Sequence, residues 1–280
     1  MNYTKEEILL EVKDVSLNLG GTDILKNVNV CIKDIKRPGV TTGQIISLLA
    51  PSGIGKTQLF EIMAGLKQPN SGSVQIFEEG LGLKNVKSGK VGVVQQKYPL
   101  YNYLTVEDNL KLSIRMKKGG IFKSVSKEDE EKIKEYVELF NLQEHIKKFP
   151  ILLSGGQRQR VAIAQQLLCS EHFLLMDEPF SGLDVLMIKK VSDTIRKVAN
   201  LHDKNTIIIV SHDIASTVAL SDTIWLMGRE RDQSGNIIPG AKILEEIDLI
   251  ERGLMWKENI ESTPEFLAVI NEIKNKFTLL

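Results

Sequence analysis

Short apolar runs alternate with amphipathic helical patterns along most of the chain. The apolar runs predict strands over residues 8–12, 24–32, 44–49, 72–77, 91–95, 173–177, 206–211, 223–227 and 241–246. The first of these indicate an antiparallel β-meander, whereas the later ones read as parallel strands that are buried on both faces. Strands that alternate with helices predict an α/β fold with a mixed sheet and a β-subdomain.

The pattern changes between residues 106 and 148, where no strand is predicted. Ile133, Val137 and Phe140 repeat there at helical spacing within a charged background. We therefore expect an inserted α-helical subdomain at about residues 97–150. Its basic, glycine-containing stretch at residues 115–127 is interpreted as a solvated loop.

Two further segments complete the outline. Residues 34–43 contain Pro and Gly between two predicted strands, which predicts a surface loop. A final helix is expected to start near Pro264. Its apolar positions fall on one face: Phe266, Ile270, Ile273 and Phe277.

Composition excludes several classes of protein. The 280 residues carry 36 Lys and Arg against 36 Asp and Glu, so the chain lacks the basic excess of a nucleic-acid coat, and we expect no nucleic-acid partner. Cys31 and Cys169 have the spacing of neither a disulfide framework nor a zinc site. The start of the chain does not read as a signal peptide, and no apolar stretch approaches the ~20 residues that span a bilayer.

A phosphate-binding loop is predicted at residues 50–57, which read APSGIGKT between an apolar strand and a helical pattern. Glycines let successive N–H groups face one anion, and the helix N-terminus adds its positive end. The candidate ATP-binding residues are Ser52, Gly53, Ile54, Gly55, Lys56, Thr57 and Gln58. Ala50 stands where the motif has Gly. It precedes a proline, which favours an extended backbone that Ala adopts if no positive φ is needed.

Two carboxylates end the apolar run at residues 173–177. Asp177 and Glu178 are therefore expected at the carboxyl edge of the sheet, where α/β proteins bind ligands. A carboxylate there can coordinate Mg²⁺, and its neighbour can orient and polarise an attacking water. Such a pair alone is more often a helix cap. Combined with the phosphate loop it is a more specific signal.

A third motif identifies the family. Ser154, Gly155, Gly156 and Gln157 begin a helical pattern and form a second anion-binding N-terminus. Together with the two carboxylates and the SGLD sequence at residues 181–184, this run resembles the ATP-binding-cassette ATPases. The resemblance covers roughly residues 8–246. It implies a P-loop NTPase core in which two subunits pack head to tail, the signature of each closing over the ATP of the other.

The resemblance assigns roles to further residues. Gln96 matches the glutamine loop that contacts Mg²⁺ and the attacking water, with Gln95 as the adjacent alternative, and His212 matches the switch histidine at the γ-phosphate. Asp184 matches the loop that crosses the dimer interface. Leu19 stands where the family stacks an aromatic ring on adenine, so a stacking contribution is expected to be lost.

Catalytic roles follow from the same resemblance. Glu178 would polarise the water, His212 would hold the water and the γ-phosphate in line, and Gln96 would contact the attacking water. The predicted Mg²⁺ ligands are Thr57, Gln96 and Asp177. The cofactors implied are ATP and Mg²⁺.

The function implied is that of an ATP-hydrolysing transporter subunit. It would form a homo- or heterodimer around two ATP and drive a separate transmembrane permease, for solute import, with a solute-binding protein as a further partner. It would lie in the cytoplasm, peripheral to the membrane. The end of the chain weakly resembles the cassettes of nitrate, sulfonate and taurine importers. The ATPase domain is predicted at residues 1–246, with a C-terminal helical extension at 247–280.

Three alternatives stay open on the sequence. One is a soluble ABC ATPase that acts on nucleic acid or in translation, and another is the ATPase of an exporter or lipid transporter. The third is a weakly active regulatory cassette, suggested by Ala50 and Leu19 but opposed by Lys56, Glu178 and His212. Tyr98, Tyr101 and Tyr103 lie in the segment 97–104 and are expected to be exposed in a groove that receives a permease helix.

Overall fold

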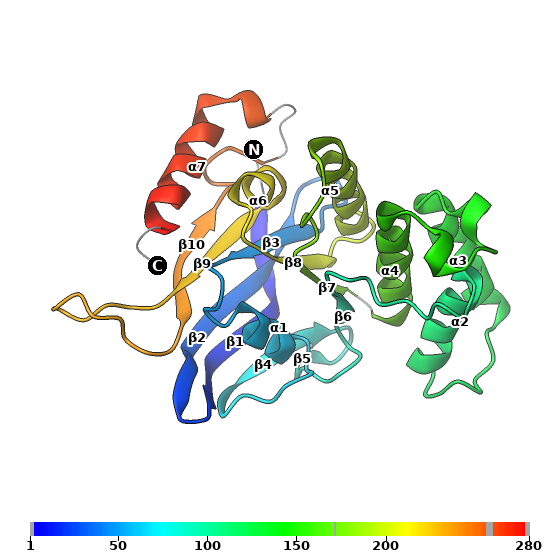
Figure 1. Ribbon diagram of the computed structural model, residues 1–280, viewed down its shortest axis with the longest axis horizontal. Coiled ribbons are helices and arrows are strands. Elements are labelled where there is room, and N and C mark those ends of the chain that lie inside the picture. The colour runs from blue at the N-terminus through cyan, green and yellow to red at the C-terminus, as the bar shows by residue number, and fades with distance from the viewer. Residues whose placement is uncertain (1–2, 171, 256–259, 278–280) are drawn as a thin grey trace.

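The computed structural model describes residues 3–170, 172–255 and 260–277 of the chain. Two sheets form its centre, and helices cover them (Figure 1). The strands are β1 (Thr4–Leu19), β2 (Thr22–Lys36), β3 (Gln44–Leu49), β4 (Ser71–Glu78), β5 (Gly82–Asn85), β6 (Gly92–Val94), β7 (Phe173–Asp177), β8 (Thr206–Ser211), β9 (Thr223–Gly228) and β10 (Lys242–Asp248).

The two sheets differ in how their strands pair. One sheet is antiparallel with the order β2-β1-β4-β5. The other has the order β10-β9-β3-β8-β7-β6, in which β10 pairs antiparallel with β9 and the remaining pairs are parallel. Every residue of β3 and β8 is buried, as their continuous apolar sequences predict. The predicted α/β fold with a mixed sheet and a β-subdomain is confirmed.

Helices surround the mixed sheet. They are α1 (Lys56–Met63), α2 (Val106–Lys117), α3 (Lys127–Leu139), α4 (Gly155–Cys169), α5 (Val185–Ala199), α6 (Ile214–Leu220) and α7 (Pro264–Phe277), with short 3-10 turns η1 (Gln143–His145), η2 (Pro150–Leu152) and η3 (Ile260–Ser262). Figure 1 shows α2 and α3 gathered beside α4 at one end of the molecule. The segment between β6 and α4 holds no strand among its described residues, in agreement with the sequence pattern.

Three apolar clusters hold these layers together. The first lies between the antiparallel sheet, α1 and one face of the mixed sheet, and it includes Leu59 and Trp225. The second joins the opposite face of the mixed sheet to α2–α5, around residues such as Leu110 and Phe140. The third packs the C-terminal helix on α6 and β9, and Ile273 lies fully buried within it. The predicted apolar face of α7 is therefore a packing face.

Several sequence predictions of elements are wrong in detail. The first two strands are longer than predicted, and the short strand β5 was not predicted. The expected surface loop at residues 34–43 begins inside β2, where Asp34 is fully buried. Strand pairing between β1 and β2 explains this, because register shifts along the pair let it continue past polar positions to Lys36. No helix among the described residues is long and apolar enough to cross a bilayer.

Candidate functional site

The topology brings three chain segments to one edge of the mixed sheet. Strand β8 lies between β3 and β7, and all three run parallel. Their carboxyl ends therefore meet at the same edge. The loop 50–55 follows β3, Glu178 follows β7, and His212 follows β8. Three motifs that are far apart in sequence are thus neighbours.

The loop between β3 and α1 presents backbone N–H groups to which a bound anion could offer acceptors. Gly55 caps α1 with φ 113°, and a Cβ at this position would lie 3.0 Å from Cγ2 of Ile24. Both observations require Gly here. Within the described residues, no hydrogen bond of the chain uses the backbone N–H groups of Gly53, Gly55, Lys56 or Thr57. These donors at a helix start fit the phosphates of a nucleotide.

The departure of Ala50 from the motif has a structural explanation. Ala50 is fully buried and is absent from the residues with positive φ, so the position does not require Gly. Ile54 buries its side chain in the first cluster and can offer a ligand only its backbone. Ser52 and Thr57 are exposed, and Gln58 accepts a hydrogen bond from Lys67.

Lys56 is held inside the loop that it follows. Its Nζ donates to the carbonyl oxygens of Ala50, at 2.7 Å, and Pro51, at 3.0 Å. Burial lowers the pKa of Lys56, and the nearby charges of Glu178 and Asp177 oppose this effect. The ammonium group is therefore close to both carboxylates. Its N–H groups donate to carbonyl oxygens here, and the same N–H groups are available to donate to phosphate oxygens.

The carboxylate of Glu178 is fixed by the end of the neighbouring strand. Nδ1 of His212 lies 2.8 Å from its Oε1, and the Ser211 hydroxyl donates to Oε2 at 3.3 Å. The Glu178 backbone has φ 48° and its N–H donates to the Val210 carbonyl at 2.8 Å. Burial raises the pKa of Asp177, and the charge of Glu178 raises it further while Lys56 lowers it. Ser211 was missed by the sequence analysis, although a hydroxyl directly before the predicted switch histidine His212 was the available signal.

Gln96 approaches this region from β6. Its Nε2 donates to the hydroxyl of Ser181 at 2.9 Å, which ties it to the loop that follows Glu178. Gln95 is held differently, because its carbonyl accepts the N–H of Tyr98. The contact with Ser181 favours Gln96 as the glutamine of the site. The Gln96 amide oxygen, the Thr57 hydroxyl and the Asp177 carboxylate are hard oxygen donors, the kind of ligand that suits Mg²⁺.

The signature residues form a complete helix cap. Ser154 caps α4, its Oγ accepting from the Gln157 N–H at 3.3 Å while Gln157 Oε1 accepts from the Ser154 N–H at 2.8 Å. A Cβ on Gly156 would lie 2.8 Å from Cε of Met187 in α5. Asp184 caps α5 by accepting from the Met187 N–H at 2.9 Å. Signature and Asp184 loop are therefore packed together.

The signature and the phosphate loop are not joined within one chain. Among the described residues, no hydrogen bond or ion pair connects Ser154–Gln157 with Lys56, Glu178 or His212. Gln157 instead meets His145, with Nε2 atoms 2.9 Å apart, a partner that the sequence did not suggest. The two helix starts that the sequence predicts as anion sites, at α1 and α4, are thus separate within the chain.

Leu19 ends β1 just before the Gly20–Gly21 turn and is 42% exposed. The following residues of that hairpin, Ile24 and Leu25, contact the phosphate loop around Gly55. The hairpin thus stands beside the loop with an aliphatic side chain open to solvent. This arrangement is compatible with apolar coverage of a base.

The aromatic segment after Gln96 differs from the prediction. Tyr101 and Tyr103 are exposed and form an edge-to-face pair with ring centroids 5.8 Å apart. Tyr98 is not fully exposed. It packs against the second cluster, and burial raises its pKa to about 12. Only two of the three tyrosines therefore present a surface.

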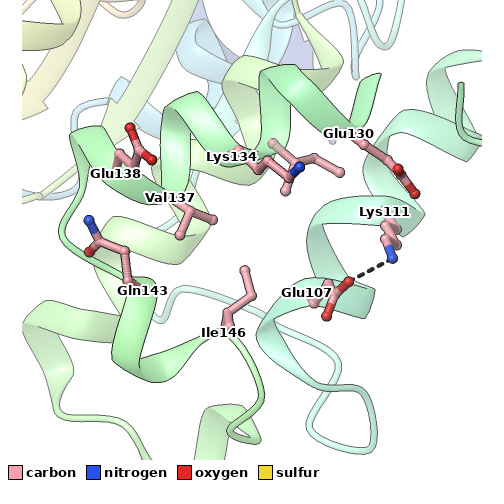
Figure 2. A pocket seen from close by; sticks show the side chains of 9 residues that line it. Glu107, Lys111, Glu130, Lys134, Val137, Glu138, Gln143 and Ile146 are labelled. Carbon is pink, nitrogen blue, oxygen red and sulfur yellow. Dashed lines mark hydrogen bonds and ion pairs between the residues drawn. The ribbon is translucent and has the colours of Figure 1, made fainter. Parts of the chain in front are cut away.

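A groove of about 390 Å³ lies on the helical subdomain. Figure 2 shows Val137 of α3 and Ile146 pointing into it, with the 2.7 Å ion pair of Glu107 and Lys111 at its α2 edge. None of the three tyrosines lines it. The groove is formed by α2, α3 and η1 instead.

Comparisons with known proteins agree with this geometry. A family model described as ABC transporter matches residues 37–181, just over half of the chain. The spermidine/putrescine import ATP-binding protein PotA of Treponema pallidum is 37% identical over 68% of this chain and 48% of its own length. The sulfate/thiosulfate import ATP-binding protein CysA of Pectobacterium atrosepticum is 35% identical over 79% of this chain and 64% of its own. The chain thus spans about half to two thirds of these relatives.

Solved structures share the fold. The protein cbiO1 of Clostridium perfringens, part of the ABC transporter complex cbiONQ, has a TM-score of 0.70 at 21% identity and covers 96% of this chain and 100% of its own. The cassette MJ0796, described as dimeric, has a TM-score of 0.62 at 26% identity over 86% of this chain and 99% of its own. It is also known in a post-hydrolysis state with ADP and Pi.

Proposed function

Because this chain belongs to the ABC transporter family of ATP-binding cassettes, we propose that it is the ATP-binding and ATP-hydrolysing subunit of a transporter. The observation that carries the proposal is the meeting of Lys56, Glu178 and His212 at one sheet edge, beside unpaired N–H groups of the phosphate loop. A nucleotide-binding module without catalysis would not need the fixed Glu178 and His212 pair.

The residues would share the work of hydrolysis. Lys56 exchanges its carbonyl contacts for the phosphates, and the free N–H groups of the loop neutralise the rest of their charge. Glu178 accepts a proton from the attacking water while His212 keeps its carboxylate aimed. Thr57, Gln96 and Asp177 would hold Mg²⁺, which supplies charge neutralisation on the phosphates. Catalysis then consists of positioning and charge stabilisation.

Two copies of the cassette would complete each site. The signature helix start at Ser154 lies apart from the phosphate loop of its own chain, yet both offer N–H donors to an anion. ATP held by one copy and covered by the signature of the other joins the two subunits, and hydrolysis removes the link. Asp184, packed against the signature through Met187, would cross this interface. All site residue types are present, so a homodimer is sufficient.

The permease would dock on the helical subdomain. The groove between α2, α3 and η1 has an apolar floor that includes Val137 and Ile146. Tyr101 and Tyr103 are exposed on the segment that immediately precedes α2 in the sequence. An amphipathic helix of a membrane subunit fits such a groove. Through Gln96 and Ser181, the start of this subdomain is hydrogen-bonded to the loop after Glu178, which links docking to hydrolysis.

Import is the direction that the relatives favour, because both are named as import ATP-binding proteins. We propose residues 1–246 as the ATPase domain, with the helical subdomain at about 97–150, and residues 247–280 as a C-terminal extension. The protein would act at the cytoplasmic face of the membrane, with a permease and a solute-binding protein as partners. No observation favours the nucleic-acid, exporter or regulatory alternatives.

The Glu178→Gln variant tests this function. Its amide oxygen can still accept from His212, so ATP should bind while the base is lost and turnover falls at least ~100-fold. With Mg-ATP, the variant should run as a dimer in size-exclusion chromatography with light scattering. The same protein, added with Mg-ATP to detergent-solubilised native membranes, should recover a polytopic membrane protein.

Two controls make these results specific. Glu265→Gln, an exposed change on α7, should keep wild-type turnover. Glu178→Gln combined with Lys56→Ala should stay monomeric, because ATP no longer binds. A monomer of Glu178→Gln at saturating Mg-ATP would count against the dimer mechanism. Recovery of ribosomal or nucleic-acid partners instead of a permease would overturn the transport function.

A further inference from the structure

A buried glutamine of α4 contacts the loop that follows Glu178. Gln159 is 1% exposed, and its Nε2 donates to the carbonyl oxygen of Pro179 at 3.2 Å. We propose that Gln159 is a positioning residue of the ATPase, which fixes the base Glu178 through the carbonyl of Pro179. This inference rests on the function proposed above, because it concerns the base of that reaction.

The burial of Gln159 indicates a specific use for its amide. Most of the other buried residues of α4 are apolar, among them Val161 and Ile163. A buried amide without a hydrogen bond costs free energy, whereas an apolar side chain of similar size fills the same space without that cost. Neither polar atom of the Gln159 side chain is among the buried, unpaired atoms of the described residues. The hydrogen bond to Pro179 therefore offsets the burial of the amide.

Pro179 directly follows a residue with a strained backbone. Glu178 has φ 48°, and a left-handed conformation of this kind persists only where the surroundings impose it. The Glu178 N–H donates to the Val210 carbonyl at 2.8 Å, and its carbonyl accepts from the Ser181 N–H at 3.2 Å. The Pro179 carbonyl is the next acceptor along the chain, and Gln159 holds it from α4. The backbone on both sides of Glu178 is thus fixed, and with it the direction of the carboxylate.

A second donor lies at the same carbonyl. The Tyr98 hydroxyl is 3.5 Å from the Pro179 oxygen, at the limit of a hydrogen bond, while its ring packs against the second cluster. Because proline has no N–H, its own amide cannot hold this turn. Side chains from α4 and from the segment after β6 therefore meet at one acceptor behind the base. Gln159 makes the shorter contact, so the positioning role is assigned to it.

Helix α4 gives Gln159 a fixed place to hold the loop from. Its start is closed by the capping box of Ser154 and Gln157, and its apolar residues pack in the second cluster. The phosphate loop lies on other elements, between β3 and α1. Among the described residues, no hydrogen bond joins Gln159 to that loop. Loss of the Gln159 donor should therefore change the aim of Glu178 and leave nucleotide binding intact.

The test compares Gln159→Met with the matched control Gln165→Met. Methionine keeps an unbranched side chain of similar length and removes the donor. Gln165 is a second buried glutamine of α4, 8% exposed, and its side chain makes no hydrogen bond within the described part of the chain. In steady-state phosphate release, Gln159→Met should lower kcat at least ~10-fold and change KM for Mg-ATP by less than ~2-fold, because a displaced base costs rate steeply. Gln165→Met should keep both values, and a wild-type kcat in Gln159→Met would overturn the inference.

The Glu178→Gln background separates positioning of the base from a general loss of structure. The base is already absent there, so Gln159→Met should change the residual single-turnover rate by less than ~2-fold. A similar loss in both backgrounds would show that Gln159 acts on the fold and not through Glu178, and it would overturn the positioning role. A wild-type chain without ATPase activity, or Glu178→Gln with wild-type turnover, would instead refute the proposed function.

Folding is checked by thermal melts followed by circular dichroism, in which Gln159→Met and Gln165→Met should both unfold cooperatively. If Gln159→Met does not fold, Tyr98→Phe replaces it, because this change removes the other donor to Pro179 and keeps the ring in the second cluster. Tyr98→Phe should lower kcat ~2-fold in the presence of Glu178 and leave the residual rate of Glu178→Gln unchanged. Equal kcat for Tyr98→Phe and wild type would then overturn the role of the Pro179 carbonyl.

Discussion

The buried carboxyl of Asp222 makes stability depend on pH in a predictable direction. It lies between the start of β3 and the start of β9, and its Oδ2 accepts from the Ile45 N–H. Burial is the main cause that raises its pKa from 3.8 to about 7, and nearby Asp248 adds to it. The Ile45 hydrogen bond and the charges of Arg196 and Arg37 act in the opposite direction.

The sign follows from proton binding. The unfolded chain loses this proton near pH 4, whereas the folded chain keeps it up to about pH 7. The contribution of Asp222 to stability is therefore fully present below pH 4. It decreases by ~1.4 kcal/mol per pH unit until about pH 7. The total is about 4 kcal/mol, a large part of the 5–15 kcal/mol by which domains are typically stable. Asp222→Asn removes the titration, and its amide oxygen can keep the Ile45 hydrogen bond.

The measurement is urea unfolding of wild type and Asp222→Asn at pH 5, 6, 7 and 8, followed by circular dichroism. The free energy of unfolding of the variant minus that of the wild type should increase by about 3 kcal/mol between pH 5 and 7, because the wild type loses stability over this range. It should not increase further at pH 8. The difference between the two proteins cancels all groups that they share. Asp232→Asn is a control for the sign, because hydrogen bonds from Asn236 lower the pKa of Asp232. Its carboxyl is charged throughout pH 5–8 in both states, so this variant should not show the pH-dependent difference. Parallel curves for wild type and Asp222→Asn would refute the reasoning.

Two further changes test the phosphate loop and the C-terminal helix. Lys56→Ala should weaken ATP binding at least ~10-fold, since a charge-assisted contact is worth about 1.5–3 kcal/mol, and calorimetry that finds an unchanged Kd would exclude the predicted loop. Phe266→Ala should lower the free energy of unfolding by ~3–5 kcal/mol, because Phe266 is 5% exposed in the third cluster. The matched control is Leu267→Ala, because this neighbour is 55% exposed. Equal losses of unfolding free energy in the two variants would contradict the packing of α7.

Local signals accounted for most of the fold and of the candidate site. The strand before the phosphate loop and the run that ends in Asp177 were predictable because burial on both faces gives continuous apolar sequences. Contacts between distant segments were not. Asp34 lies in a strand because β1 pairs with its neighbours Lys33 and Ile35, and Tyr98 is half-buried because it packs against the second cluster. Neither neighbour is visible in the local pattern.

Side-chain partners set the same limit within the site. The types and order of the catalytic candidates could be read from the chain, but the contact of Gln96 with Ser181 depends on how β6 and the loop after β7 meet. The groove of the helical subdomain is another case. The sequence directed attention to tyrosines at residues 98–103, whereas packing of α2 on α3 forms the groove elsewhere.

The backbone of Glu178 connects stability with the proposed activity. A glutamate in the left-handed region, with φ 48°, costs ~1–3 kcal/mol, and such strain persists only where the surroundings impose it. Here the Val210 carbonyl holds the backbone N–H, while His212 and Ser211 hold the carboxylate. The strain turns the side chain toward the strand end that carries His212, next to Lys56. Because no hydrogen bond or ion pair among the described residues joins the signature to this group, the proposed base is positioned within one chain while the proposed site is not closed there, and we expect hydrolysis to require the dimer.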